Sequence, residues 1–272
     1  MRLISKGFYR AWACALVLVV CAGVTPRPCG AANSRPVVIE EFTFIWCTYC
    51  YGVGTALGRM LDQAPYQDLI VVAYHLDDPY SIPFDAERRD YYNVTGEPTV
   101  QFNGLNPMVG GSSVDEGEPG VDQVTGRLTD SITAERARVA GSLPFELRLT
   151  GSLGPENPSL DLFVSSPQGY PRPVNAIFLI VEEGIPVTQT PNNGELFINA
   201  VPRATLGTRP ISLTAPGSST RIQVALTGTV PHHSAALLRP VVFLQDDTTK
   251  EILGAAGALS NVNAAANWNL YP

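Results

Sequence analysis

The chain has 272 residues, which is long enough for two ordinary domains with cores of their own. It is 45% hydrophobic and only 16% charged, a composition typical of globular and not of disordered proteins. The formal net charge of −7 excludes the basic footprint that nucleic acids and anionic membranes require. We therefore expect an acidic globular protein that does not bind nucleic acid.

The first 32 residues have the pattern of a secretory signal peptide. Arg2, Lys6 and Arg10 precede an apolar run over residues 11–24, which is too short to span a bilayer as a mature helix. Cleavage is expected after Ala32, with a site after Ala22 as the alternative. Loss of residues 1–32 removes four basic residues and no acid, and so changes the formal charge from −7 to −11. These features predict an exported protein of the periplasm or cell envelope.

A lipid anchor at Cys21 is the less favoured alternative for this segment. The sequence before it, Leu18 to Val20, resembles a lipoprotein motif, but valine stands where a small residue is wanted. Attachment to the envelope therefore stays open.

Residues 37–45 form an apolar, β-branched run that predicts a buried strand, and residues 51–63 have apolar positions at helical spacing. Cys47 and Cys50 lie between the two. A helix N-terminus stabilises a thiolate on the first cysteine, and a second cysteine one turn on can resolve a mixed disulfide. This placement predicts a redox pair, although half of a zinc site has the same spacing.

The other cysteines favour the redox interpretation. Cleavage after Ala32 leaves Cys47 and Cys50 as the two cysteines of the mature chain. A structural zinc needs four ligands, and the histidines (His75, His232 and His233) are widely scattered. We expect these histidines in loops or at the surface, and we expect no metal and no cofactor.

The next elements continue an alternation of strands and helices. Residues 68–74 predict a buried strand, 85–92 a short helix, 99–102 a strand, and 121–140 a helix after a loop rich in glycine. This order is β-α-β-α-β-α. One of the strands that usually form a hairpin in such a domain is not clearly visible in the sequence.

Three motifs in this half resemble the thioredoxin superfamily: Glu41, Trp46-Cys47-x-x-Cys50, and Val94-x-Gly96-x-Pro98-Thr99. The resemblance implies an α/β thioredoxin-like fold over residues 33–140. It implies that Cys47 is the nucleophile, Cys50 the resolving thiol, and Pro98 a cis-proline facing them.

The resemblance also suggests roles for the residues around the pair. Glu41 takes the place of the buried acid that accepts a proton from the resolving cysteine, although a structural role at a strand edge stays open because Glu40 obscures the register. Trp46, Tyr49 and Glu97 are expected to contact the substrate beside Pro98. Thr48-Tyr49 replaces the Gly-Pro dipeptide of thioredoxin itself, so the substrate class does not carry over.

Residues 141–272 differ in composition from the preceding residues, because proline and glycine are frequent. Short alternating strands are predicted at residues 145–149, 160–164, 176–181, 221–226 and 240–244. Their spacing favours an all-β, immunoglobulin-like antiparallel sandwich, with a domain boundary after Ala140. Residues 180–185, 199–203 and 241–253 resemble the C-terminal region of bacterial envelope and outer-membrane lipoproteins that join a thioredoxin-like domain to a β-sandwich.

Two functions remain open from the sequence. The first is an exported thiol–disulfide oxidoreductase that acts on protein disulfides and is recycled by an unidentified redox partner. The alternative is a non-catalytic envelope protein in which the sandwich recognises a ligand and the thioredoxin scaffold is inert. The sequence predicts neither the substrate nor the oligomeric state.

Overall fold

A computed structural model describes residues 35–153 and 158–257 of the chain. The expected signal peptide at residues 1–32, including Cys21, lies outside the described residues. No helix within the described ranges is both long and apolar enough to cross a membrane.

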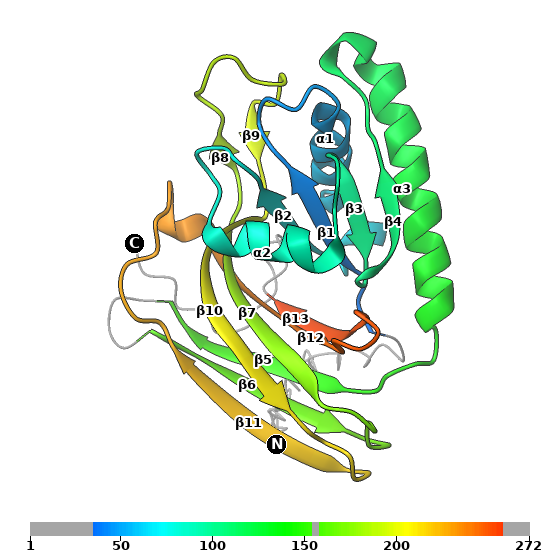
Figure 1. Cartoon of the computed structure of the whole chain (residues 1–272), viewed down its shortest axis with the longest axis vertical. Helices are drawn as coiled ribbons and strands as arrows, with labels where there is room; N and C mark the ends of the chain where they lie inside the picture. Colours follow the sequence, from blue (N-terminus) through cyan, green and yellow to red (C-terminus); the bar gives the residue numbers. More distant parts are fainter. Residues whose placement is uncertain (1–34, 154–157, 258–272) are drawn as a thin grey trace, which may run out of the picture. The chain divides into compact units, whose positions relative to one another are not determined.

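The N-terminal half is built on a four-stranded sheet in the order β2-β1-β3-β4 (Figure 1). Its strands are β1 (Val38–Thr43), β2 (Ile70–His75), β3 (Thr99–Phe102) and β4 (Leu105–Val109). β1 pairs in parallel with β2 and antiparallel with β3, and β3 and β4 form a hairpin. Because β1 and β2 are buried on both faces, their sequences do not alternate between apolar and polar residues as a half-exposed strand would.

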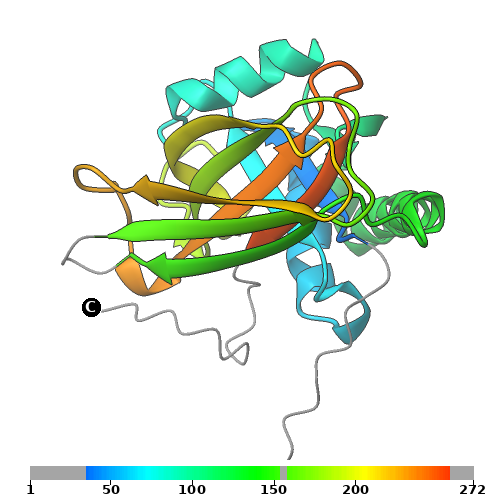
Figure 2. The same cartoon turned by 90° about the horizontal axis from the view of Figure 1, so that it is seen from below.

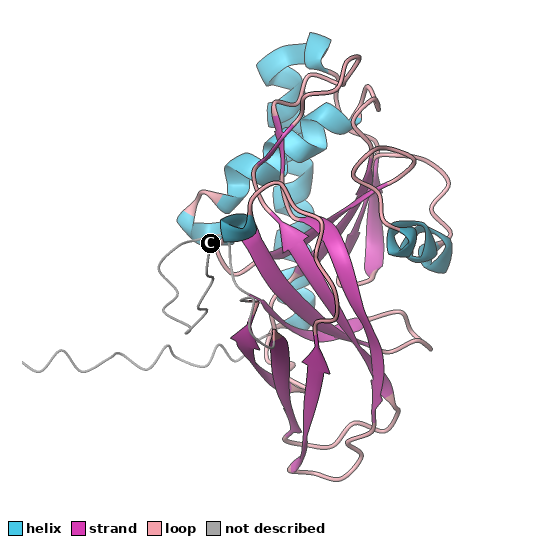
Figure 3. Cartoon of the chain, turned by 90° about the vertical axis from the view of Figure 1, so that its left-hand side faces the viewer, coloured by secondary structure: helices cyan, strands magenta, loops and turns pink. Residues whose placement is uncertain are grey.

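Three α-helices surround this sheet: α1 (Cys50–Leu61), α2 (Pro83–Tyr92) and α3 (Gly117–Val139). The apolar sides of α1 and α3 pack on one face of the sheet, against residues such as Ile39, Val71 and Val100. α2 lies against the other face (Figure 1). Figure 3 shows that the α-helices gather around this first sheet.

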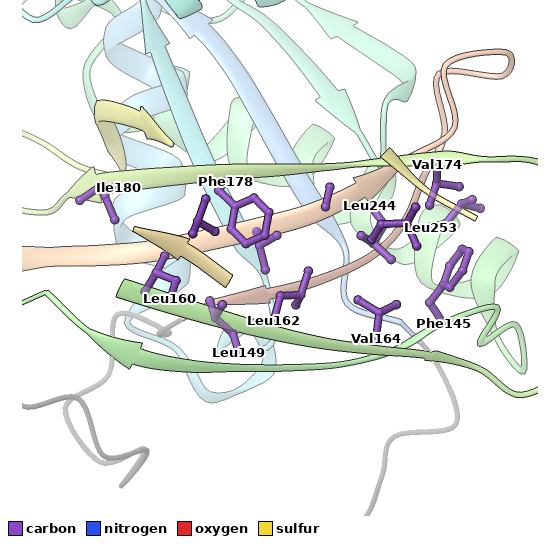
Figure 4. Close-up of a cluster of buried hydrophobic side chains, with 14 of the residues drawn as sticks. Phe145, Leu149, Leu160, Leu162, Val164, Val174, Phe178, Ile180, Leu244 and Leu253 are labelled. Carbon is purple, nitrogen blue, oxygen red and sulfur yellow. The ribbon is translucent and has the colours of Figure 1, made fainter. Parts of the chain in front are cut away.

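The C-terminal half is an antiparallel sandwich (Figure 2). One sheet has the order β10-β7-β12-β13 and the other the order β11-β6-β5. The strands are β5 (Glu146–Ser152), β6 (Ser159–Ser166), β7 (Val174–Glu182), β10 (Val201–Ile211), β11 (Ser218–Ala225), β12 (Leu238–Gln245) and β13 (Ile252–Gly257). Figure 4 shows the core between the two sheets, which includes Phe145, Leu162 and Phe178.

The two halves share a second core. Val38, Phe42 and Val72 of the first sheet pack against Leu179 of β7 and Phe243 of β12. The boundary predicted after Ala140 falls between α3 and β5. The division into two domains, residues 33–140 and 141–272, stays a prediction.

A short arm extends from the sandwich half toward the first helix. It consists of β8 (Ile185–Pro186), β9 (Phe197–Ile198) and the loop between them, and we call it the β8–β9 arm. Ile185 and Ile198 pack with Ile45 and Tyr80 of the N-terminal half. Just after the arm, the carbonyl of Ala200 accepts a hydrogen bond from the backbone N–H of Ala73 in β2. The arm is therefore anchored on the N-terminal half.

Candidate functional site

Cys47 and Cys50 form a disulfide at the N-terminus of α1, with their Cα atoms 5.3 Å apart. Cys50 is the first residue of the helix and is fully buried, whereas 6% of Cys47 is exposed. Trp46 and Tyr49 beside them are 46% and 56% exposed. The pair therefore lies just beneath an aromatic surface.

Hydrogen bonds to both backbone groups of Ile45 hold the segment that leads into the cysteines. The N–H of Ile45 donates to Asp78 Oδ2 over 3.1 Å, and the carbonyl of Ile45 accepts from the backbone N–H of Asn193 over 2.6 Å. Asn193 belongs to the β8–β9 arm, so the sandwich half helps to position the cysteine loop. Farther along, the N–H of Gly52 in the first turn of α1 donates to the carbonyl of Ser112 over 2.9 Å.

The Glu97–Pro98 peptide bond is cis, and Pro98 is buried. Gly111 packs between this proline and the cysteine loop. A Cβ atom at position 111 would overlap with the carbonyl oxygen of Tyr49 and lie 3.1 Å from Pro98 Cγ. The structure therefore brings Pro98 and the cysteine loop together around one glycine, as the resemblance implies.

Glu97 is half-buried, and burial raises the pKa of its carboxyl group. Arg89 opposes this shift and Asp77 reinforces it, so Glu97 faces charges near α2. Its expected contact with substrate, like those of Trp46, Tyr49 and Pro98, stays a prediction.

Glu41 is buried on the sheet face that α1 covers. It does not lie at a strand edge, because β1 is flanked by β2 and β3. Its Oε1 atom has no hydrogen-bond partner among the described residues, and burial raises the pKa of its carboxyl well above the usual range, with a further contribution from Glu195. A buried carboxyl group with a raised pKa is a candidate proton donor and acceptor.

Glu195 of the β8–β9 arm lies beside Glu41, and its role was not predicted from the sequence. Burial, followed by the nearby Asp78, raises the pKa of Glu195 to about 7, and a hydrogen bond from Asn193 opposes the shift. A Cβ atom at Gly54 of α1 would overlap with Glu195 Oε1. The carboxyl group therefore reaches α1 because residue 54 has no side chain.

The expectation that His75 lies in a loop or at the surface was wrong. His75 ends β2, is almost fully buried, and lies 2.6 Å from Asp78 Oδ2 through its Nδ1 atom. An unbroken run of buried strand residues carries it into the interior, where Asp78 satisfies its polar ring. His232 and His233 are exposed. Within the described ranges, no group of three or more His, Cys, Asp or Glu residues is arranged to hold a metal ion.

No protein-family model and no curated protein sequence matches this chain. Among solved structures it is similar to HBP35 of Porphyromonas gingivalis, with a TM-score of 0.62, 16% sequence identity, and coverage of 82% of this chain and 74% of that chain. A β-glucosidase of Listeria innocua and one of Bifidobacterium adolescentis match at TM-scores of 0.25 and 0.22, with 12% and 11% identity. Each covers 42% of this chain, and the match takes in 16% of each enzyme.

The likeness to HBP35 establishes the fold alone, because the identity is low. It confirms the expected class, an α/β thioredoxin-like region with a parallel strand pair followed by antiparallel sheets. The Cys47–Cys50 disulfide lies within that thioredoxin-like region.

Proposed function

We propose that this protein is an exported thiol–disulfide oxidoreductase of the thioredoxin superfamily that acts on protein disulfides. The observation that carries the proposal is the Cys47–Cys50 disulfide at the start of α1, with the cis-proline Pro98 beside its loop. The location in the periplasm or cell envelope rests on the signal-like residues 1–32.

The exchange runs in two steps. The thiolate of Cys47 attacks one sulfur of a substrate disulfide, so a Cys47–substrate bond forms and the other substrate sulfur leaves as a thiolate. Cys50 then loses its proton and attacks the Cys47 sulfur, which closes the Cys47–Cys50 bridge and releases the second substrate thiolate. Run in reverse, the same steps oxidise a substrate dithiol. An external redox partner resets the pair.

The differing burial of the cysteines supports these roles. Cys47 is the more exposed of the two, and helix N–H groups favour its thiolate over that of an ordinary cysteine. Cys50 is enclosed, which favours intramolecular attack on Cys47 over reaction with solutes. The exposed rings of Trp46 and Tyr49 offer apolar contact to a polypeptide substrate.

The direct test is reduction of insulin by the exported form of the protein in the presence of dithiothreitol. We expect the wild-type protein to accelerate insulin precipitation, Cys47→Ser to abolish the acceleration, and Cys50→Ser to accumulate a mixed disulfide through Cys47. The matched control is Thr48→Ser, an exposed position between the cysteines that keeps its hydroxyl group. Wild-type turnover no faster than that of Cys47→Ser would instead favour the non-catalytic envelope binding protein.

A further inference from the structure

Two cavities meet at Glu195. The first has a volume of about 20 Å³ and is lined by Glu41 and His75 of the sheet, Gly54 and Leu57 of α1, and Glu195. The second is a larger cavity of about 520 Å³ between α1 and the arm, where the exposed residues Leu196 and Phe197 also contribute. Glu195 lines both, whereas Glu41 lines the small one alone.

The small cavity suits a single water molecule. A volume of about 10–15 Å³ is enough for one water when polar partners surround it. Glu41 supplies one such partner, because its buried Oε1 atom lacks a hydrogen bond to residues 35–153 and 158–257. A water here would connect the two carboxyl groups.

The cavity lies on the side of α1 that carries the resolving cysteine. Residues four apart on a helix share a face, and Gly54 follows Cys50 by four positions. Gly54 lines both cavities and is also where Glu195 meets the helix. Glu195 therefore meets α1 one turn after Cys50, and it shares the small cavity with Glu41.

We propose that Glu195, carried by the β8–β9 arm, relays protons between Glu41 and solvent during opening and closing of the Cys47–Cys50 bridge. This inference rests on the proposed function, since it assigns a residue to the same redox pair. Glu195 acts through Glu41 and is therefore a positioning residue.

The step balances as follows. An incoming thiolate attacks the Cys47 sulfur, the Cys47–Cys50 bond breaks, and Cys50 leaves as a thiolate that takes a proton from Glu41. Glu41 regains a proton from Glu195 through the cavity water, and Glu195 regains one from solvent in the larger cavity. Closing the bridge sends the proton outward along the same path.

The charges around Glu195 define the pH dependence. Asp78 raises the pKa of Glu195, Asn193 donates to its Oε2 atom and lowers that pKa, and Glu195 in turn raises the pKa of Glu41. The other titratable residues that line the two cavities are His75, Tyr51, Arg59, Asp62 and Glu183. Glu195 loses its proton as the pH rises through about 7, so proton supply to Cys50 falls over that range.

The test measures how fast dithiothreitol opens the bridge, as a rate constant per thiolate, between pH 5 and 9. We expect the wild-type value to fall with a midpoint near pH 7. Glu195→Gln keeps an oxygen for Asn193 but cannot transfer the proton, so the midpoint should disappear and the rate constant at pH 6 should drop roughly tenfold. Glu195→Asp retains a carboxyl group and should retain the midpoint.

The matched control is Glu183→Gln. Glu183 lines the larger cavity but not the small one, and burial raises its pKa as well. This variant should keep the wild-type profile. A wild-type profile without the midpoint, an unchanged profile in Glu195→Gln, or the same loss in Glu183→Gln would overturn the proposal.

A second measurement uses the wild-type protein and needs no variant to fold. An infrared difference spectrum of the oxidised protein between pH 6 and pH 8 should show the loss of a protonated-carboxyl band, because Glu195 gives up its proton in that range, and the absence of this change would overturn the relay. Neither experiment uses a protein substrate. Failure to turn over insulin, by contrast, counts against the proposed function.

Discussion

Glu40 and Glu41 are neighbours in the sequence with opposite environments, because side chains alternate between the two faces of a strand. Glu41 faces α1 and the small cavity, and its Oε1 atom has no partner in the part of the chain that the structure describes. Glu40 faces α2, where it pairs with Arg88 over 2.6 Å, and it accepts hydrogen bonds from Tyr74 and Tyr92. The first suits proton transfer, and the second is a satisfied structural charge.

Arg88 provides a test of this structural charge. Arg88→Ala removes the partner of a buried carboxylate and should lower the free energy of unfolding by about 3–5 kcal/mol. Arg89→Ala, which removes the more exposed pair with Asp90, should cost less than about 1 kcal/mol. Urea denaturation of both variants measures the difference. Equal losses would show that the Glu40–Arg88 pair does not stabilise the fold.

The sequence predicted Cys47, Cys50 and Pro98 because each belongs to a local motif with fixed spacing. It could not separate Glu40 from Glu41, since both lie in a strand that is buried on both faces and therefore has no alternation to read. Glu195 gave no signal at all. It lies in an arm far along the chain and reaches the site through the tertiary fold.

At the scale of elements, Gly111 sets how closely the loop after β4 approaches the cysteine loop and Pro98. Gly111→Ala should displace the carbonyl of Tyr49, because the added Cβ atom meets backbone that cannot rotate away. We expect a fall in insulin reduction of about tenfold, as misplacement of a site by a fraction of an ångström is costly. Gly96→Ala is the control, since a Cβ atom there would meet none of the described residues within 4 Å. Equal activity in the two variants would contradict this view of the site.

Most regular elements were predicted to within a few residues, because their apolar patterns are long. The missed strands are β8 and β9, which have two residues each, and three strands whose patterns proline and glycine interrupt. β4 contains Pro107 and follows a turn with left-handed Asn103 and Gly104. β10 contains Pro202, Gly207 and Pro210 and has two irregularities of register against β7. β13 is short and rich in glycine and alanine, which are poor strand formers.

At the scale of the whole molecule, the sandwich half supports the site as well as the fold. Leu179 and Phe243 complete the core behind the first sheet, and Gln245 accepts a hydrogen bond from Arg88 over 2.8 Å. Asn193 of the β8–β9 arm donates a hydrogen bond to the cysteine loop, and Glu195 of the arm raises the pKa of the buried Glu41. The redox chemistry that we propose therefore draws on both halves of the chain.

The reduction potential of the Cys47–Cys50 pair tests the central claim most directly. The wild-type protein is equilibrated in thiol–disulfide buffers of stepped potential, alkylated, and scored by mass for free thiols at both cysteines. A redox-active pair should titrate reversibly as a two-electron couple, with a midpoint between about −270 and −120 mV, the range of catalytic disulfides. A midpoint below about −300 mV, typical of structural disulfides, or an irreversible titration would contradict the account.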